Sequence, residues 1–208
     1  MSASPGSLKQ FHGLVERSYP RGGHLYTAGE PAQHLFVIRR GAVHLVRLTE
    51  EGQRLITDVL GPGQVCGEEA LRPDGVYQAS AVTLQPTSVT LVSHQTLHQL
   101  VLVHPDLVVT LLARLEERLE RASERLVEVA SQRVPSRVAA ALLRQMAGCA
   151  CPVLQLTHQD IADMVGTQRE VVTRLLDHLR SRGAIRLGRG RVEVLNAELL
   201  AALRKEPF

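Results

Sequence analysis

The chain has 208 residues, 44% of them apolar, which is enough for one large domain or two small ones. No apolar run reaches the length of a transmembrane helix, and no charged-then-apolar leader opens the chain. We therefore expect a cytoplasmic protein with no membrane partner. The net charge of +3 is uneven, because residues 1–131 carry 12 basic and 14 acidic residues, whereas residues 132–208 carry 12 and 7. Net charges of −2 and +5 indicate that only the second part contacts a polyanion.

Residues 19–92 contain short apolar-alternating segments separated by glycines. The alternation predicts strands at 34–40, 42–48, 53–60 and 88–92. Short, evenly spaced strands with turn signals are typical of an antiparallel barrel or jelly roll. Before them, the pattern over 8–15 predicts a short helix, and between the second and third strands Glu50-Glu51-Gly52 predicts a hairpin turn.

Two residue pairs have a spacing that could bind a metal ion. His94 and His98 lie one turn apart on a predicted helix over 94–104, and Cys149 and Cys151 form a C-x-C pair. Neither pair has a third ligand nearby, so we interpret the histidines as surface residues and the cysteines as incidental thiols. We expect no metal site, and three cysteines are too few for a disulfide framework.

The longest predicted helix runs from Pro105 to about Gln132. Its apolar residues follow alternating steps of four and three, and charged residues fill the flanks. An apolar stripe as narrow as this one, called the seam below, is typical of a parallel two-stranded homodimer. The alternative is a helix lying on its own barrel, and Leu107, Leu111 and Val127 widen the stripe enough for both. The seam consists of Val108, Leu112, Leu115, Leu119, Ala122, Leu126 and Val129.

The last third of the chain begins with a proline. Val134-Pro135-Ser136 predicts a hinge, and residues 136–147 form an amphipathic helical pattern. Near the C-terminus, residues 185–187 and 192–195 flank Gly188-Arg189-Gly190, which predicts a β-hairpin with an arginine at its tip. The arginines of this hairpin suit phosphate contacts, and the alternative is a solvated hairpin edge.

Between these elements, residues 157–179 predict two short helices around a tight turn. Thr157 with Asp160 has the spacing of a cap for the first helix, and Gly166 ends that helix. Thr167 with Glu170 has the capping-box spacing for the second helix. Two short helices joined by a glycine turn are typical of a helix–turn–helix.

Three charged side chains lie off the apolar stripe of the second helix. Arg169 and Glu170 fall in its first turn, and Arg174 follows about one turn later. Arginine can donate two hydrogen bonds to guanine, and glutamate can accept one from cytosine. A carboxylate facing DNA is repelled by phosphates unless it contacts a base. The alternative is a solvated charged face, but the preceding helix, the glycine turn and the basic surroundings favour base reading.

The order of barrel, long helix, proline hinge and winged helix–turn–helix resembles the CRP/FNR family of bacterial transcription regulators over about residues 19–195. The most specific segment, Gly166-Thr-Gln-Arg-Glu-Val-Val-Thr-Arg174, is similar to the family's G-x-S-R-E-T-V-x-R. The next, Val65-Cys-Gly-Glu-Glu-Ala-Leu71, is similar to F-G-E-x-A-L. The resemblance implies an α+β protein. Its parts would be an antiparallel β jelly-roll barrel (1–104), a dimerisation helix with its hinge (105–134) and a winged helix–turn–helix (135–208).

The resemblance also implies which residues contact DNA. Arg169, Glu170 and Arg174 would read a half-site resembling TGTGA, in an inverted repeat with half-sites roughly 34 Å apart. The implied partners are double-stranded DNA, a second copy of the chain and RNA polymerase. The implied phosphate contacts are Thr157, Gln168, Thr173 and Arg189.

The expected effector pocket matches the family less closely. Gly67 and Glu68 hold the pair that contacts ribose, but Gln78 and Ala79 replace the Arg-Ser pair that binds the cyclic phosphate. Losing one charge-assisted contact costs about 1.5–3 kcal/mol. Of the Thr-Ser pair that contacts adenine, only Ser123 remains. We therefore expect a regulator that requires no cofactor, and keep a response to cyclic AMP as the second hypothesis.

Three further alternatives stay open. The family's iron–sulfur sensors need four cysteine ligands, mostly near the N-terminus, where this chain has none; for a haem sensor, no motif pairs Cys66 with a histidine. A cyclic-nucleotide-binding signalling module without a DNA role is disfavoured by Gln78 and Ala79 and by the recognition-helix match. An enzyme is disfavoured because no nucleophile–base pair or metal trio has a meaningful spacing.

Overall fold

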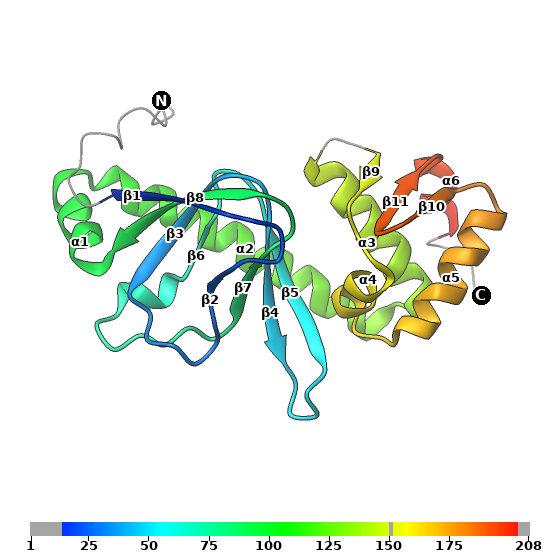
Figure 1. Cartoon of the computed structure of the whole chain (residues 1–208), viewed down its shortest axis with the longest axis horizontal. Helices are drawn as coiled ribbons and strands as arrows, with labels where there is room; N and C mark the ends of the chain where they lie inside the picture. Colours follow the sequence, from blue (N-terminus) through cyan, green and yellow to red (C-terminus); the bar gives the residue numbers. More distant parts are fainter. Residues whose placement is uncertain (1–13, 150–151, 204–208) are drawn as a thin grey trace. The chain divides into compact units, whose positions relative to one another are not determined.

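The structure is a computed structural model that describes residues 14–149 and 152–203 (Figure 1). The chain divides into two compact units, one within residues 1–47 and 57–118 and the other within 48–56 and 119–208. Each unit has its own hydrophobic core, so the two are described separately. The predicted pair of Cys149 and Cys151 cannot be followed, because Cys151 and the side chain of Cys149 lie outside the described part.

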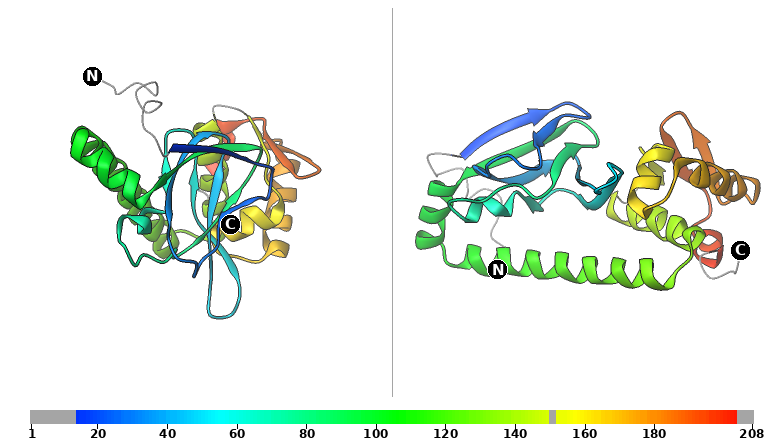
Figure 2. Two further views of the ribbon diagram at one scale, coloured as in Figure 1. Left: turned by 60° about the vertical axis from the view of Figure 1, so that its left-hand side comes forward. Right: turned by 90° about the horizontal axis from the view of Figure 1, so that it is seen from below.

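The first unit consists mainly of two four-stranded sheets that form a barrel, with α1 at one end (Figures 1 and 2). Residues 48–56, which join two of these strands, are grouped with the second unit. The strand pairs with a resolved register are antiparallel. One sheet, in the order β1-β8-β3-β6, consists of Leu14–Tyr19, Thr87–Ser93, His34–Arg40 and Val65–Cys66. The other, in the order β2-β7-β4-β5, consists of His24–Tyr26, Ser80–Thr83, Val43–Leu48 and Arg54–Leu60.

The alternating pattern located the long strands of this barrel. The strand predicted over 34–40 is confirmed at its bounds, two others begin one residue later than predicted, and the strand predicted over 88–92 is one residue longer at each end. The pattern does not predict β2, β6 and β7, because segments of two to four residues are too short to alternate visibly. The helix expected over 8–15 is wrong for Leu14 and Val15. Both pair with β8, whose backbone hydrogen bonds override the local pattern, and residues 8–13 lie outside the description.

Two helices follow the barrel strands. Helix α1 (His94–Val103) begins at Ser93, whose hydroxyl accepts a hydrogen bond from the Thr96 amide at 3.2 Å. His94 and His98 lie on this helix, as predicted, and no metal-binding cluster is found among residues 14–149 and 152–203. Helix α2 (Asp106–Ser131) is the long predicted helix and ends within one residue of the expected position.

The second unit begins, after residues 48–56, with the part of α2 from residue 119 on, and its described residues after α2 form four helices and a small sheet. Helix α3 (Val134–Cys149) begins earlier than predicted, since Pro135 lies in its first turn, where a missing amide hydrogen costs nothing. The break between α2 and α3 is therefore at residues 132–133 and not at the proline. The remaining elements are β9 (Val153–Leu154), α4 (His158–Val165), α5 (Arg169–Ser181), β10 (Ile185–Gly188), β11 (Arg191–Val194) and α6 (Ala197–Leu203).

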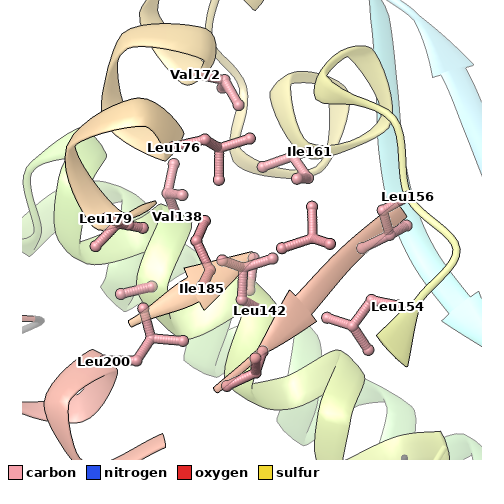
Figure 3. Packing of buried hydrophobic residues seen from close by; sticks show 14 of the residues in the cluster. Val138, Leu142, Leu154, Leu156, Ile161, Val172, Leu176, Leu179, Ile185 and Leu200 are labelled. Atoms are coloured by element: carbon pink, nitrogen blue, oxygen red, sulfur yellow. The ribbon is translucent and has the colours of Figure 1, made fainter. Parts of the chain in front are cut away.

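A dense apolar core joins these elements (Figure 3). Leu142 of α3, Ile161 of α4 and Leu176 of α5 are each fully buried, and Ile185 of the sheet packs with them. Packing three helices and a hairpin on one core fixes the direction in which α5 presents its outer face. Among the described residues, no single helix has both the length and the hydropathy of a membrane span, although the bent pair of 94–103 and 108–131 passes on length and composition together.

Candidate nucleic-acid interface

The first helix of the predicted helix–turn–helix is capped at both ends. At its start the Thr157 hydroxyl accepts a hydrogen bond from the Asp160 amide at 3.1 Å, and the Thr157 amide donates to Asp160 Oδ2 at 2.9 Å. At its end Gly166 adopts the left-handed conformation with φ of 66°, which glycine reaches without strain. The predicted capping box and glycine stop are confirmed, so the turn into α5 is sharply defined.

Helix α5 begins one residue later than the sequence suggests. Its N-cap is Gln168, in extended conformation and without a side-chain cap bond. The predicted capping box of Thr167 with Glu170 is therefore wrong. The reason is that the Thr167 amide donates to Ala162 O at 3.1 Å and completes the end of α4 instead. Glu170 is consequently an exposed residue of the first turn of α5 rather than a capping group.

The apolar stripe of α5 orients its charged face outward. Val172 and Leu176 are fully buried against the core of the second unit (Figure 3). Arg169, Glu170 and Arg174 lie on the other side and are exposed. Within the described part of the chain, their side chains have no hydrogen-bonding or ion-pairing partner. Three unpaired charged groups on one rigid helix face are available to an external ligand.

A hydrogen-bonded chain connects the two helices beneath this face. His158, the first residue of α4, has its Nδ1 2.9 Å from the Thr173 hydroxyl oxygen. The Thr173 hydroxyl in turn donates to Arg169 O at 2.9 Å. The Thr173 side chain is half-buried, and its hydroxyl has hydrogen-bond partners on both helices. Gln168, which precedes α5, is exposed. No pattern in the sequence singles out His158, although its position directly after the Thr157 cap places it beside the predicted interface.

The wing is a hairpin, as predicted, whose strands β10 and β11 pair in antiparallel register up to Gly188 and Arg191. Gly190 adopts a positive φ of 66° in the two-residue turn, and Arg189 beside it is exposed. Arg186 forms an ion pair with Glu193 at 3.0 Å across the strands. Arg186 of the wing is therefore partly neutralised, whereas Arg189 is exposed at the tip.

In the barrel, the first of the predicted effector-pocket residues is a glycine in left-handed conformation. Gly67 has φ of 80°, and a Cβ there would lie 2.7 Å from His34 O, so only glycine fits. The next residue, Glu68, opens the 3₁₀ helix η2 (Glu68–Leu71). Its carboxylate accepts a hydrogen bond from Arg118 of α2, and the same guanidinium lies 3.2 Å from Asp58. The carboxylate expected to contact ribose is already ion-paired within the protein.

The buried ion pairs affect the titration of Arg118. Burial alone lowers the pKa of this guanidinium, but the charges of Glu68 and Asp58 outweigh burial and raise it. Arg118 therefore remains a cation at every physiological pH and neutralises both carboxylates.

Aromatic rings fill the barrel behind Glu68. Tyr26 and Tyr77 stack with ring centroids 3.9 Å apart, and Phe36 lies 5.3 Å from Tyr26. The Tyr77 hydroxyl donates to His34 O at 2.9 Å, which fixes the ring. Cys66 is fully buried in the same core, and burial raises the pKa of its thiol to about 12. The interior of the barrel is packed and apolar at this point.

Of the remaining pocket residues, Ala79 packs against this apolar core, whereas Gln78 and Ser123 are not part of it. The side-chain amide of Gln78 donates to Val76 O at 3.1 Å, and its backbone amide donates to Glu69 Oε1 at 3.1 Å. Gln78 is exposed, and Ala79 is half-buried. The Ser123 hydroxyl donates to Leu119 O of its own helix at 3.0 Å. A hollow of about 820 Å³ on the barrel surface is lined by residues of 31–34, 72–76 and 93–95, and includes none of the five predicted pocket residues.

Comparison with known proteins decides the family. Residues 16–104 match the family model of the cyclic nucleotide-binding domain, and residues 136–203 match that of the Crp-like helix-turn-helix domain. The chain is 34% identical to the cyclic AMP receptor protein of Thermus thermophilus, covering 91% of this chain and 94% of that protein. The chain belongs to the CRP/FNR family.

Other CRP/FNR proteins agree with this assignment. A CRP-like cAMP-activated global transcriptional regulator of Mycobacterium tuberculosis is 30% identical, covering 88% of this chain and 85% of that protein. The crystal structure of a CRP/FNR transcriptional regulator from Thermus thermophilus matches with a TM-score of 0.80 and 28% identity, covering 92% and 99% of the two chains. The α+β fold of barrel, long helix and winged helix–turn–helix is thus confirmed, and the chain is a transcription regulator with a DNA-binding domain.

As a CRP/FNR regulator, the chain has a long helix whose predicted seam is largely uncovered. Leu112, Leu119 and Leu126 are 59%, 69% and 72% exposed. Val108 and Leu115 are half-buried, and the exposed Ala122 and Val129 complete the seam. Leucines seven residues apart therefore form an apolar stripe on the surface of α2.

Proposed function

We propose that this regulator binds a TGTGA-like inverted repeat as a homodimer and does so without cyclic AMP. The observation that carries the proposal is the outer face of α5, where Arg169, Glu170 and Arg174 are exposed and unpaired among the described residues. Because these side chains have no partner among the described residues, no internal hydrogen bond or ion pair is broken when they contact base edges. The buried stripe beneath them holds the helix in one orientation, which base reading requires.

Two roles divide the DNA contacts. Arg169, Glu170 and Arg174 would contact bases, because arginine matches guanine and glutamate matches cytosine. A second group of residues would contact the phosphates around them, as polar side chains and wing arginines do. This group consists of Gln168 and Arg189, whose side chains are exposed, together with Thr157 and Thr173, whose hydroxyl hydrogens would have to leave Asp160 Oδ2 and Arg169 O to reach a phosphate.

The homodimer proposal rests on the exposed stripe of α2. Burying an exposed leucine side chain contributes about 1.5–3 kcal/mol, so leucines repeating every seven residues supply substantial binding energy to a partner helix. A second copy of the chain carries the same stripe and fits it by symmetry. Two copies would present two copies of α5, which matches the two halves of an inverted repeat.

Independence from cyclic AMP rests on the barrel. Arg118 already neutralises Glu68, and neither Gln78 nor Ala79 supplies a cation for a cyclic phosphate. The aromatic core formed by Tyr26 and Tyr77 leaves this part of the barrel packed. The second candidate is a cyclic-AMP-dependent regulator, which is favoured by the names of the Thermus and Mycobacterium relatives. We further propose that the protein acts in the cytoplasm, contacts RNA polymerase and catalyses no reaction.

A gel-shift titration tests this proposal. The purified chain is added to a TGTGA-type inverted repeat with competitor DNA at fixed salt, with and without cyclic AMP. We expect the same tight, specific shift in both series. A shift that requires cyclic AMP would instead support the second candidate, and equal affinity for a scrambled repeat would contradict sequence-specific reading.

A further inference from the structure

A hollow of about 410 Å³ lies beside the proposed base-reading face. It lies where the start of α4, the start of α5 and the tip of the wing meet. Anions bind readily at such places, because helix starts present amide hydrogens and a positive dipole end. The hollow is lined by Leu156, Thr157, His158, Gln159, Arg169, Gly188 and Gly190.

Most polar groups of this lining are already engaged. The Thr157 hydroxyl donates to Asp160 Oδ2 at 2.7 Å, and the Gln159 amide donates to Asp163 Oδ1 at 2.7 Å. Because Arg169 is proposed to contact a base, His158 is the lining side chain that remains to meet an anion in the hollow. Arg169 is always charged, whereas an imidazole changes its charge between about pH 5 and 8.

The hydrogen bonds of His158 determine what its ring can offer. The Thr173 hydroxyl has one hydrogen and donates it to Arg169 O at 2.9 Å. Its oxygen must therefore accept from His158 Nδ1, 2.9 Å away. This bond places the proton of the neutral ring on Nδ1 and leaves Nε2 with a lone pair. A neutral His158 would thus turn an acceptor toward an incoming phosphate, and only the imidazolium has a second donor.

We propose that His158 binds a DNA backbone phosphate only as the imidazolium, so that each half-site takes up one proton from solvent on binding. This inference rests on the proposed DNA-binding function and deepens it by making affinity depend on pH. The ion pair formed with the phosphate is charge-assisted at Nε2, while the bond from Nδ1 to Thr173 is retained.

Arg169 is the charged side chain that lines the hollow together with His158. Asp160 on the same helix is occupied by Thr157. Arg169 and Arg174 lie on α5, while Arg189 and Arg191 lie on the wing.

The test measures DNA affinity by fluorescence anisotropy from pH 5.5 to 8.5 at fixed salt, with the full chain and the inverted repeat. The wild-type dissociation constant is expected to rise with pH, by up to about tenfold per pH unit for each proton taken up. His158→Gln and His158→Arg are expected to lose this dependence, and His158→Arg to stay tight at pH 8.5. The matched control is His178→Gln, because His178 lies near the other end of α5. The dissociation constant of this variant should depend on pH as that of the wild type does.

Isothermal titration calorimetry of DNA binding, which needs no fluorescent label, gives a second, independent readout. Titrations in two buffers of different ionisation enthalpy should report proton uptake near pH 7 for wild type and a smaller uptake for His158→Gln. Equal pH dependence in wild type and His158→Gln, or no proton uptake, would overturn this inference while leaving DNA binding intact. Absence of specific binding at every pH would overturn the proposed function as well.

Discussion

Exposed arginines in the DNA-binding unit look alike in the sequence, but they differ in what surrounds them. Arg174 projects from the rigid face of α5, whereas Arg189 lies in the two-residue turn of the wing. Arg186, only three residues before Arg189, is partly neutralised by its ion pair with Glu193. We therefore expect Arg174 to contact a base and Arg189 to contact a phosphate.

Replacing Arg174 and Arg189 should separate these two roles. Arg174→Ala is expected to weaken binding to the cognate repeat by about 1–3 kcal/mol and to relax the preference at one base pair. Arg189→Ala should weaken cognate and random DNA alike and reduce the salt dependence, because a phosphate contact carries no sequence information. Titrations of both variants on both DNAs at several salt concentrations distinguish the roles. Equal losses on random DNA would show that the assignment is wrong.

The thiol of Cys66 is expected to be chemically inert in the folded protein. Its pKa is raised to about 12 by burial, so the thiolate that reacts with alkylating agents is essentially absent at pH 8. Iodoacetamide labelling followed by mass spectrometry should leave Cys66 unmodified in buffer and modify it in denaturant. Rapid labelling of Cys66 in the native protein would instead favour a redox-sensing role.

At the scale of elements, α2 has two different faces. One face anchors the helix to the barrel of its own unit through Arg118, Glu68 and Asp58. The other carries exposed leucines with no partner among the described residues of this chain. These faces predict separable effects of mutation, one on stability and one on assembly.

Removing Arg118 should destabilise the barrel. Arg118→Leu leaves two carboxylates without their cation, one of them the well-buried Asp58, and is expected to cost about 1–3 kcal/mol. The matched control is Arg114→Leu, because the ion pair of Arg114 with Glu117 is about half exposed on the same helix and should contribute less than about 0.5 kcal/mol. Denaturant unfolding of the two variants gives the comparison. Similar losses would indicate that the Arg118 pairs are no stronger than a surface pair.

A charge in the exposed seam should prevent assembly without affecting the fold. Leu119 is 69% exposed in the single chain, so Leu119→Glu disturbs no internal packing but would place like charges together in a symmetric pair of helices. Light scattering should show monomers. Val109→Glu, an equally exposed apolar site outside the seam, should remain dimeric. A dimeric Leu119→Glu with the same melting temperature as wild type would place the dimer contact elsewhere.

How far the sequence predicts these elements depends on the range of the interactions that form them. The strand at 34–40, the cap at Thr157 and the stop at Gly166 depend on local periodicity and backbone geometry, and the sequence predicts them correctly. Thr167 fails as a cap because its amide is used by the end of the preceding helix. The interactions of Arg118 with Glu68, 50 residues apart, and of His158 with Thr173 depend on tertiary folding, so no local pattern contains them.

On the scale of the molecule, the DNA-binding unit has a core of its own. All its core residues lie between Val138 and Leu200, and none comes from the barrel. A fragment of residues 134–208 is therefore expected to fold alone and melt cooperatively by circular dichroism. Leu176→Ala in this fragment should lose about 2–5 kcal/mol, since the side chain is fully buried. A fragment without a cooperative transition would show that the unit needs the rest of the chain.

The exposed leucine stripe of α2 would also set how such a regulator responds to its own abundance. Where monomers predominate, mass action makes the concentration of pairs grow as the square of the total, so doubling synthesis raises the DNA-competent form about fourfold. A protein that needs no small molecule could in this way convert a modest change in expression or degradation into a steep change in promoter occupancy. The strength of one helix seam would then determine the threshold of the response.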